Sequence, residues 1–232
     1  IMENLNFFKL LFFRIYHFLF IERFFKKLSF SFPENIYRWD LTQLIIDKYN
    51  FKNYLEIGCD KNQSFSKIIV NNKVGVDPIS GGTIRSTSDD FFLKNLNDNY
   101  DVIFIDGLHH YEQVIKDIKN SLKILNNDGF ILVHDCLPRT LAHQAVPRYR
   151  GSWNGDVWKS IVVLRNDINL DIITCEIDFG VAIIRKRKNQ NPLNLSQKDL
   201  KSLKFQDYYY NHKKFMNIKN YNASLIYLNL DK

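Results

Sequence analysis

The sequence contains little cysteine, and the few cysteines that it has are scattered. Cys59, Cys136 and Cys175 are the only ones among 232 residues, and none stands in a Cys-x-x-Cys spacing. An odd number of isolated cysteines excludes a disulfide framework and argues against a cysteine zinc site. This usage fits a reducing compartment, and we expect the protein to be cytoplasmic.

The middle of the chain has no excess of positive charge, although the formal net charge of the whole chain is +7. Basic residues gather near the two ends, at 9–27 and 185–188, whereas the middle is nearly balanced. The sequence has neither a basic groove pattern over the core nor a motif that reads RNA or DNA. We therefore predict that nucleic acid is not a partner.

A long apolar run without charges is also absent. Segment 5–32 is dense in Phe and Leu, but Lys9, Arg14, Glu22 and Arg23 interrupt it, so it is too charged for a membrane span. No small-residue cleavage site of a signal peptide follows it. Two interpretations stay open. The segment is a helix that covers apolar surface of the core or of a second copy in a homo-oligomer, or it lies peripherally at the inner face of a membrane with its basic residues toward the head groups.

Hydrophobic residues make up 45% of the chain, which is enough for one sizeable core. We divide the chain into an N-terminal helical segment (1–50), a core domain (51–187) and a basic C-terminal tail (188–232). The tail begins with a polar linker and continues with a predicted helix over 198–218.

Strand and helix patterns alternate through the core domain, after a helix that the periodicity predicts within 33–49. Predicted strands cover 53–57, 73–76, 83–86, 101–105, 129–134, 170–176 and 179–185. Predicted helices cover 63–70, 88–96, 111–125 and 154–165, and a Ser cap opens the second of them. Alternation of this kind predicts an α/β fold with a parallel sheet, except that the last two strands are too close for a crossover and must be antiparallel.

Two strand ends suit an adenosine-containing cofactor. The strand in YLEIGCD (54–60) ends at Gly58, where backbone can approach a ligand in the crevice of a doubly wound sheet. Asp77 ends the next strand about twenty residues later, where an acid accepts the ribose hydroxyls of NAD or S-adenosylmethionine. The loop GCDKNQS (58–64) has only one glycine, so a pyrophosphate fits poorly, and the neighbouring Glu56 suits a cationic amino-acid moiety.

Two further strand ends carry acids and histidines. The strands in DVIFIDGLHHY (101–111) and GFILVHD (129–135) are followed by Asp106, His109, His134 and Asp135. Sequential parallel strands are usually neighbours, so we expect these four side chains to converge at one edge of the sheet. Convergence of acids and imidazoles at a strand edge predicts a site of chemistry.

The motifs LEIGC, GVDP, FIDGLHHYE and ILVHD, with WNGDVWK at 153–159, resemble those of class I S-adenosylmethionine-dependent methyltransferases. They are most similar to the branch of macrocin-type sugar O-methyltransferases, over roughly residues 50–185. The resemblance implies a Rossmann-like, mostly parallel seven-stranded sheet with helices on both faces and an antiparallel last strand, flanked by N-terminal helices and a C-terminal helical tail. This sequence departs from the first motif, because Asn62 or Gln63 stands where the family usually has a further glycine.

The resemblance also implies a set of cofactor contacts. Glu56 and Gly58 would face the methionyl part of S-adenosylmethionine, and Asp77 would take the ribose hydroxyls. Ser88 and Asp89, at the start of a helix, would lie near adenine. Asp106 would lie close to the transferred methyl group.

A metal site and a general base follow from the same resemblance. Asp106, His134 and Asp135 would bind magnesium or a softer divalent ion, since a histidine replaces a hard oxygen ligand. His109 or His134 would remove the proton of the acceptor, with Asp106 beside them. The acceptor would be a sugar, a glycan or another small molecule with a hydroxyl. An NAD-dependent oxidoreductase and a non-catalytic adaptor on the same fold remain as alternatives, and the adaptor predicts that the His and Asp side chains do not converge.

Overall fold

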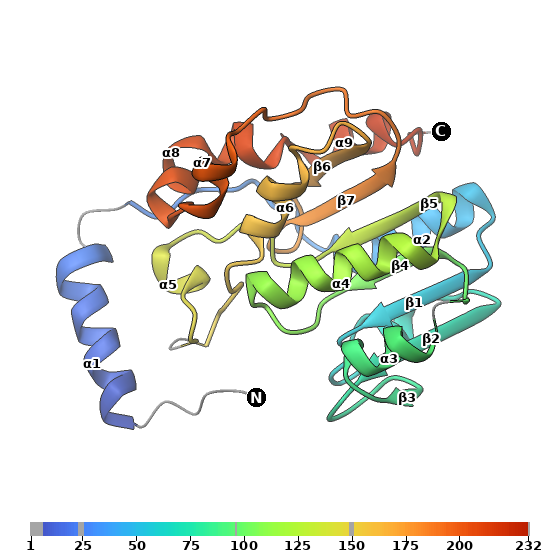
Figure 1. Ribbon diagram of the computed structural model, residues 1–232, viewed down its shortest axis with the longest axis horizontal. Helices are drawn as coiled ribbons and strands as arrows, with labels where there is room; N and C mark the ends of the chain where they lie inside the picture. The colour runs from blue at the N-terminus through green and yellow to red at the C-terminus, as the bar shows by residue number, and fades with distance from the viewer. Residues whose placement is uncertain (1–6, 23–25, 96, 149–150, 232) are drawn as a thin grey trace.

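A sheet of eight strands separates two layers of helices (Figure 1), in a computed structural model that describes residues 7–22, 26–95, 97–148 and 151–231. The strand order within these residues is β3-β2-β1-β4-β5-β7-β6-β8. The strands are β1 (Asn53–Ile57), β2 (Asn72–Asp77), β3 (Ile84–Arg85), β4 (Tyr100–Ile105), β5 (Leu125–Val133), β6 (Leu170–Cys175), β7 (Val181–Lys186) and β8 (Ile218–Lys219).

Helices precede, connect and follow these strands. The α-helices are α1 (Phe7–His17), α2 (Arg38–Tyr49), α3 (Ser88–Lys94), α4 (Tyr111–Ile124), α5 (Leu141–Gln144), α6 (Trp158–Leu164), α7 (Gln197–Lys201), α8 (Phe205–Met216) and α9 (Tyr221–Tyr227). Two short turns of other types are η1 (Phe18–Glu22), a π-helix, and η2 (Phe65–Lys67), a 3-10 helix.

The sheet confirms the α/β prediction. Strands β1 to β5 pair in parallel, and β7 is antiparallel to both β5 and β6. The seven predicted strands are all present. An eighth, β8, comes from the C-terminal tail and pairs in parallel with β6, so the tail extends the sheet.

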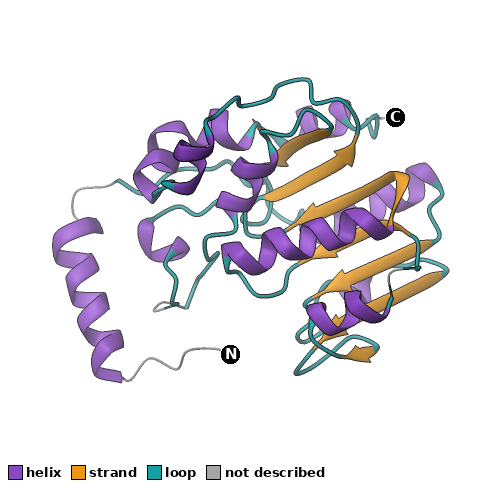
Figure 2. Cartoon of the chain, viewed as in Figure 1, coloured by secondary structure: helices purple, strands orange, loops and turns teal. Residues whose placement is uncertain are grey.

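Both faces of the sheet are buried, as expected where helices cover both sides. On β4, Ile103 and Ile105 pack with α3, α4, α6 and α8, whereas Val102 and Phe104 pack on the other face with α2 and α9. Figure 2 shows α4 in front of the strands and α2 behind them. Alternate strand residues therefore supply two separate cores.

The register of the four central parallel strands explains where their following residues lie. Val76, Ile57, Ile105 and Val133 are cross-strand neighbours in one row. The residue after each of them in the chain is, in turn, Asp77, Gly58, Asp106 and His134. These four positions therefore form the next row, at the carboxyl edge of the sheet. The strand order reverses between β1 and β4, which places a crevice at the middle of this row.

The predicted helix over 63–70 is wrong. Only the single turn η2 forms there, and the chain is extended again at Ile68 (ψ 124°). The ammonium of Lys73 donates to the carbonyl oxygens of Phe65 and Ile68, at 2.9 Å each, so these oxygens bind a side chain instead of continuing a helix. Ile68, Ile69 and Val70 are β-branched and favour the extended backbone.

Three other helix boundaries differ from the prediction. Thr87, not a serine, caps α3 by accepting a hydrogen bond from the amide of Asp90. The helix predicted over 154–165 begins only at Trp158. The tail helix predicted over 198–218 is two helices, α7 and α8, each with its own N-terminal cap. Asp199 accepts a hydrogen bond from the hydroxyl of Ser196 at the start of α7, and Asp207 accepts one from the amide of Lys204 at the start of α8.

The N-terminal segment forms α1 and η1, and its predicted residues 5–6 and 23–25 lie outside the described part. In Figure 1, α1 stands apart from the sheet. Among the described residues, the helices are all too short or too polar to cross a membrane.

Candidate functional site

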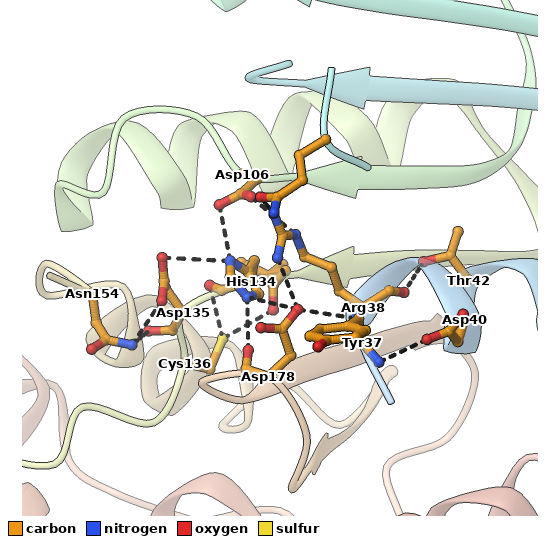
Figure 3. Close-up of polar contacts among 12 residues, drawn as sticks. Tyr37, Arg38, Asp40, Thr42, Asp106, His134, Asp135, Cys136, Asn154 and Asp178 are labelled. Atoms are coloured by element: carbon orange, nitrogen blue, oxygen red, sulfur yellow. Dashed lines mark hydrogen bonds and ion pairs between the residues drawn. The ribbon is translucent and has the colours of Figure 1, made fainter. Parts of the chain in front are cut away.

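Two acids and two histidines meet at the carboxyl edge of β4 and β5 (Figure 3 shows three of them). His134 Nδ1 lies 3.1 Å from Asp106 Oδ1 and 3.4 Å from Asp135 Oδ2. His109 joins the same two carboxylates, with Nε2 3.3 Å from Asp106 and Nδ1 3.3 Å from Asp135. The sequence-predicted residues Asp106, His109, His134 and Asp135 are thus brought together, and the register row accounts for the positions of Asp106 and His134. The adaptor alternative predicted the opposite.

Backbone hydrogen bonds between neighbouring strands fix the positions of Asp106 and His134. The amide of Asp106 donates to Ile57 O at 2.8 Å, and the amide of His134 donates to Ile105 O at 3.0 Å. The parallel pairing therefore continues one residue past each strand, and the side chains of Asp106 and His134 leave neighbouring strands side by side.

A backbone oxygen sets the orientation of the His134 ring. Nε2 donates to Asp178 O at 2.7 Å, in the turn between β6 and β7. With that nitrogen committed to a carbonyl, Nδ1 is the atom presented to Asp106 and Asp135. Asp178 and Phe179 have φ angles of 38° and 62°, so the turn adopts the left-handed region to bring this carbonyl to the ring.

Asn154 holds the second carboxylate. Its Nδ2 donates to Asp135 Oδ1 at 2.8 Å, which leaves Oδ2 directed at the two histidines. Asp135 itself has a φ of 59°, in the left-handed region that aspartate adopts more readily than most residues. Both residues are buried.

The segment before α6 locks the His109 loop in place. Trp153 stacks on the His109 ring with centroids 5.1 Å apart and an interplanar angle of 21°. Gly155 has a φ of 64°, and a Cβ on it would lie 1.8 Å from His109 O, so only glycine allows this approach. Trp158, by contrast, is fully buried against Tyr208. Of the two tryptophans in this segment, only Trp153 touches the cluster.

Arg38 and Asp178 belong to the site but were missed from the sequence. Arg38, the first residue of α2, places Nη1 2.8 Å from Asp178 Oδ2 and Nε 3.5 Å from Asp106 Oδ2. Figure 3 shows its guanidinium between these two carboxylates. No sequence signal marks Arg38, because its approach depends on how α2 docks beside the sheet. The signal for Asp178 is its place in a tight Asp-Phe-Gly turn between two strands.

Mutual charges shift the pKa values of the cluster. Burial opposes the charged form of both histidines, yet Asp106 and Asp135 more than offset it, so the pKa of His134 lies well above its usual value and that of His109 is also raised. Burial opposes ionisation of the acids too, but His134 and His109 hold the pKa of Asp106 far below its usual range. His134 and Arg38 likewise lower the pKa of Asp178 to about 2.

The other end of the register row holds the proposed cofactor residues. Gly58 has a φ of 88°, and a Cβ there would lie 2.3 Å from Asp106 O, so the turn after β1 lies directly against the end of β4. Glu56 is buried and accepts a hydrogen bond from Tyr54 OH at 2.5 Å. Burial raises the pKa of Glu56 to about 7.

Asp77, Ser88 and Asp89 are engaged by the protein itself. The Asp77 carboxylate accepts hydrogen bonds from the amides of Asp60, Ile79 and Ser80, which ties the loop after β1 to the loop after β2. Ser88 and Asp89 both accept hydrogen bonds from the side-chain amide of Gln113 on α4. Asp89 also accepts one from the ammonium of Lys116 on the same helix. A ribose or adenine role for these three residues stays a prediction.

The donor set fits a divalent cation. One ligand atom each from Asp106, His134 and Asp135 lies within 4.8 Å of the other two. A histidine that binds a metal must be neutral, and with neutral histidines the carboxylates of Asp106, Asp135 and Asp178 carry two negative charges more than the guanidinium of Arg38 balances. One divalent ion would balance this charge, and two carboxylates with an imidazole suit a borderline metal as well as magnesium.

A family model and several solved structures of low identity are similar to parts of this chain. A family model for a methyltransferase domain matches residues 50–136. No curated protein matches the chain. The SAH-bound methyltransferase PaMTH1 of Podospora anserina is 19% identical with a TM-score of 0.52, and the match covers 65% of this chain and 78% of that one.

Two other solved structures are similar at lower TM-scores. A putative caffeoyl-CoA O-methyltransferase from Staphylococcus aureus is 18% identical with a TM-score of 0.48, covering 68% of this chain and 86% of that one. The MycE methyltransferase of the mycinamycin biosynthetic pathway, in complex with Mg and SAH, is 14% identical with a TM-score of 0.47, covering 68% of this chain and 51% of that one.

The matched segment runs from the end of α2 to the residue after Asp135, and it includes Gly58, Asp77, Asp106 and His134. The matched segment supplies the parallel strands β1 to β5, and the antiparallel β7 that the resemblance implied follows it in the chain. Residues 50–136 of this chain therefore match a methyltransferase domain, and the fold is similar to that of the solved methyltransferase PaMTH1.

Proposed function

We propose that the protein transfers the methyl group of S-adenosylmethionine to a hydroxyl of a sugar or glycan, with a divalent cation at Asp106, His134 and Asp135. The observation that carries this proposal is the convergence of these three side chains and His109 beside the Gly58 turn, with distances of 3.1–3.4 Å between the histidine nitrogens and the carboxylate oxygens. The sugar acceptor rests on the similarity of FIDGLHHYE and ILVHD to macrocin-type sequences.

Gly58 and Glu56 support S-adenosylmethionine over NAD. The loop after β1 runs through Asp60 and Asn62 with φ angles of 41° and 60°, and no regular helix follows whose N-terminus could hold a pyrophosphate. A buried carboxyl two residues before Gly58 suits the cationic methionyl part of S-adenosylmethionine.

The chain's own residues would perform the proton transfer. As the acceptor oxygen bonds to the methyl carbon and the carbon–sulfur bond breaks, the hydroxyl proton passes to His109, which Asp106 and Trp153 hold in place. A bound divalent ion would lower the pKa of the acceptor hydroxyl and orient it. Arg38 and Asn154 would keep the carboxylates of Asp106 and Asp135 in position.

Calorimetric titration with S-adenosylmethionine, S-adenosylhomocysteine and NAD tests the cofactor. We expect both sulfur compounds to bind and NAD not to bind. Absence of binding by either sulfur compound would contradict the proposal, and binding of NAD alone would favour the oxidoreductase.

Labelled methyl transfer to a panel of free sugars, with catechol as a contrasting acceptor, tests the acceptor class. Methylation of catechol alone would contradict a sugar hydroxyl. Activity that is unchanged by a chelator and by Asp135→Ala would remove the metal from the proposal. His109→Ala and His134→Ala, assayed separately, identify the base.

A further inference from the structure

The segment formed by α1 and η1 exposes apolar side chains over a broad surface. Phe7, Leu11 and Ile15 form one row of residues four apart, and Phe8, Phe12 and Tyr16 form the adjacent row. All six are exposed, up to 75% at Phe8. The η1 turn continues the surface with exposed Phe18, Leu19 and Phe20. An apolar surface of this kind on a folded protein marks an interaction site.

Basic residues flank this apolar surface. Lys9, Lys26 and Lys27 are exposed, and in the sequence from 7 to 27 Glu22 is the only acid, against five lysines and arginines. Aromatic and aliphatic side chains beside lysines are the composition of helices that lie in the interface of an anionic bilayer. The charge is therefore complementary to anionic head groups.

We propose that the α1–η1 segment attaches the protein to the surface of an anionic lipid bilayer. The 11 residues of α1 and 5 of η1 are too few to cross a bilayer, so the segment lies in the plane of the interface with its two apolar rows toward the acyl chains. This inference stands independently of the proposed reaction.

The size of the segment disfavours a second copy of the chain as the occupant. A helical segment of this length is roughly 24 Å long and about 10 Å across, since each residue adds about 1.5 Å. One face of it buries well below the roughly 800 Å² per partner of a stable protein interface. Attachment to a bilayer needs no such minimum area, because each large apolar side chain that enters the acyl region adds to the binding.

The attachment would bring the candidate site close to the membrane. η1 contacts α5, which lies in the connection between β5 and α6. Asn154, which binds Asp135, belongs to the same connection. The bound segment and the site are therefore linked through one stretch of chain.

Flotation of the full chain with lipid vesicles tests the attachment. We expect binding to phosphatidylcholine vesicles that contain about one third phosphatidylserine, weaker binding to pure phosphatidylcholine, and a loss at high salt. Phe8→Glu combined with Phe12→Glu should lower the fraction bound at least tenfold, because both changes put charge on the apolar rows. A matched control is Leu93→Glu combined with Ile226→Glu, which changes two exposed apolar residues on α3 and α9 and should leave binding unchanged.

Three outcomes overturn the proposal. The first is a wild-type chain that does not float with anionic vesicles. The second is equal binding by the Phe8→Glu, Phe12→Glu variant. The third is a wild-type dimer, seen by light scattering, that becomes a monomer in this variant while vesicle binding is absent, since a second copy would then be the occupant.

Discussion

The side-chain amide of Asn154 holds Asp135 through its backbone oxygen and one carboxylate oxygen. Its Nδ2 donates to Asp135 Oδ1, so removal of the amide frees the Asp135 carboxylate to rotate away from His109 and His134. We expect Asn154→Ala to lower the affinity for Mn²⁺ by about 10- to 100-fold, the usual effect of losing a partner of a metal ligand. Titration calorimetry with Mn²⁺ measures it.

A matched control for Asn154 is Asn95→Ala. The Asn95 side chain donates to Phe91 O at the end of α3 and does not contact the cluster. Its removal should leave Mn²⁺ affinity unchanged. If the Asn154→Ala variant binds Mn²⁺ with the same affinity as the wild-type protein, the side-chain amide of Asn154 has no part in metal binding.

Glu56 makes the stability of the protein depend on pH. Burial raises its pKa to about 7 in the folded state, from 4.5. Between these values the folded state holds a proton that the unfolded chain has lost, so stability falls as pH rises through this window. The loss amounts to at most about 3.5 kcal/mol above pH 7, at about 1.4 kcal/mol per pKa unit.

Glu56→Gln removes this titration and retains a partner for Tyr54 OH. We expect the variant to gain stability relative to the wild-type protein as pH rises from about 5 to about 8. Urea unfolding at the two pH values gives the difference in unfolding free energy. If the two proteins show parallel pH dependence, Glu56 does not titrate in this window.

Which site residues the sequence reveals depends on how each is positioned. Asp106 and His134 each follow a buried apolar strand directly, so strand recognition and parallel pairing are enough to place them together. Arg38 begins a helix, and its contact with Asp106 requires α2 to dock against the sheet. The Asp-Phe-Gly sequence marks a turn at Asp178, but the contact of Asp178 with His134 requires two successive left-handed residues, and the sequence does not specify that conformation.

At the scale of elements, the sequence predicts the strands more accurately than the ends of the helices. The buried apolar runs of β4 and β5 leave little choice of structure, whereas helix ends depend on single side chains. Asp199 and Asp207 each lie in the first turn of a helix, and the helical periodicity of the tail hides the break between them. β8 has only two residues and forms because the tail folds back beside β6, which is a tertiary effect.

Arg165 connects the tail to the core. This buried guanidinium follows α6 and donates to the carbonyl oxygens of Lys214 and Phe215 at the end of α8 and to that of Asn191. A cation at these oxygens also stabilises the helix C-terminus. Arg165→Met should lower the unfolding free energy by about 3 kcal/mol, because it leaves buried carbonyl groups without a donor.

Urea unfolding measures this loss, with Lys116→Met as the control. Lys116 pairs with Asp89 on the surface, with side chains 54% and 39% exposed, so its removal should cost less than about 1 kcal/mol. Equal losses in the two variants would mean that the tail is not held through Arg165.

At the scale of the whole molecule, a ligand that binds only the folded chain adds to its stability. The donor set of Asp106, His134 and Asp135 is assembled from two strands and does not exist in the unfolded chain. A divalent ion at about one hundred times its dissociation constant should therefore raise the unfolding free energy by about 2.7 kcal/mol. Urea unfolding with Mn²⁺ and with a chelator measures the difference.

Two variants show whether this gain comes from the cluster. Asp135→Asn should abolish the gain, because it removes an anionic ligand. Asp101→Asn should keep it, because Asp101 lies at the opposite end of β4 and binds the amides of Lys52 and Asn53. Asp101→Asn is expected to lower stability equally with and without the ion. A gain that survives Asp135→Asn would place the ion elsewhere on the molecule, and the carboxyl edge of β4 and β5 would then act without a metal.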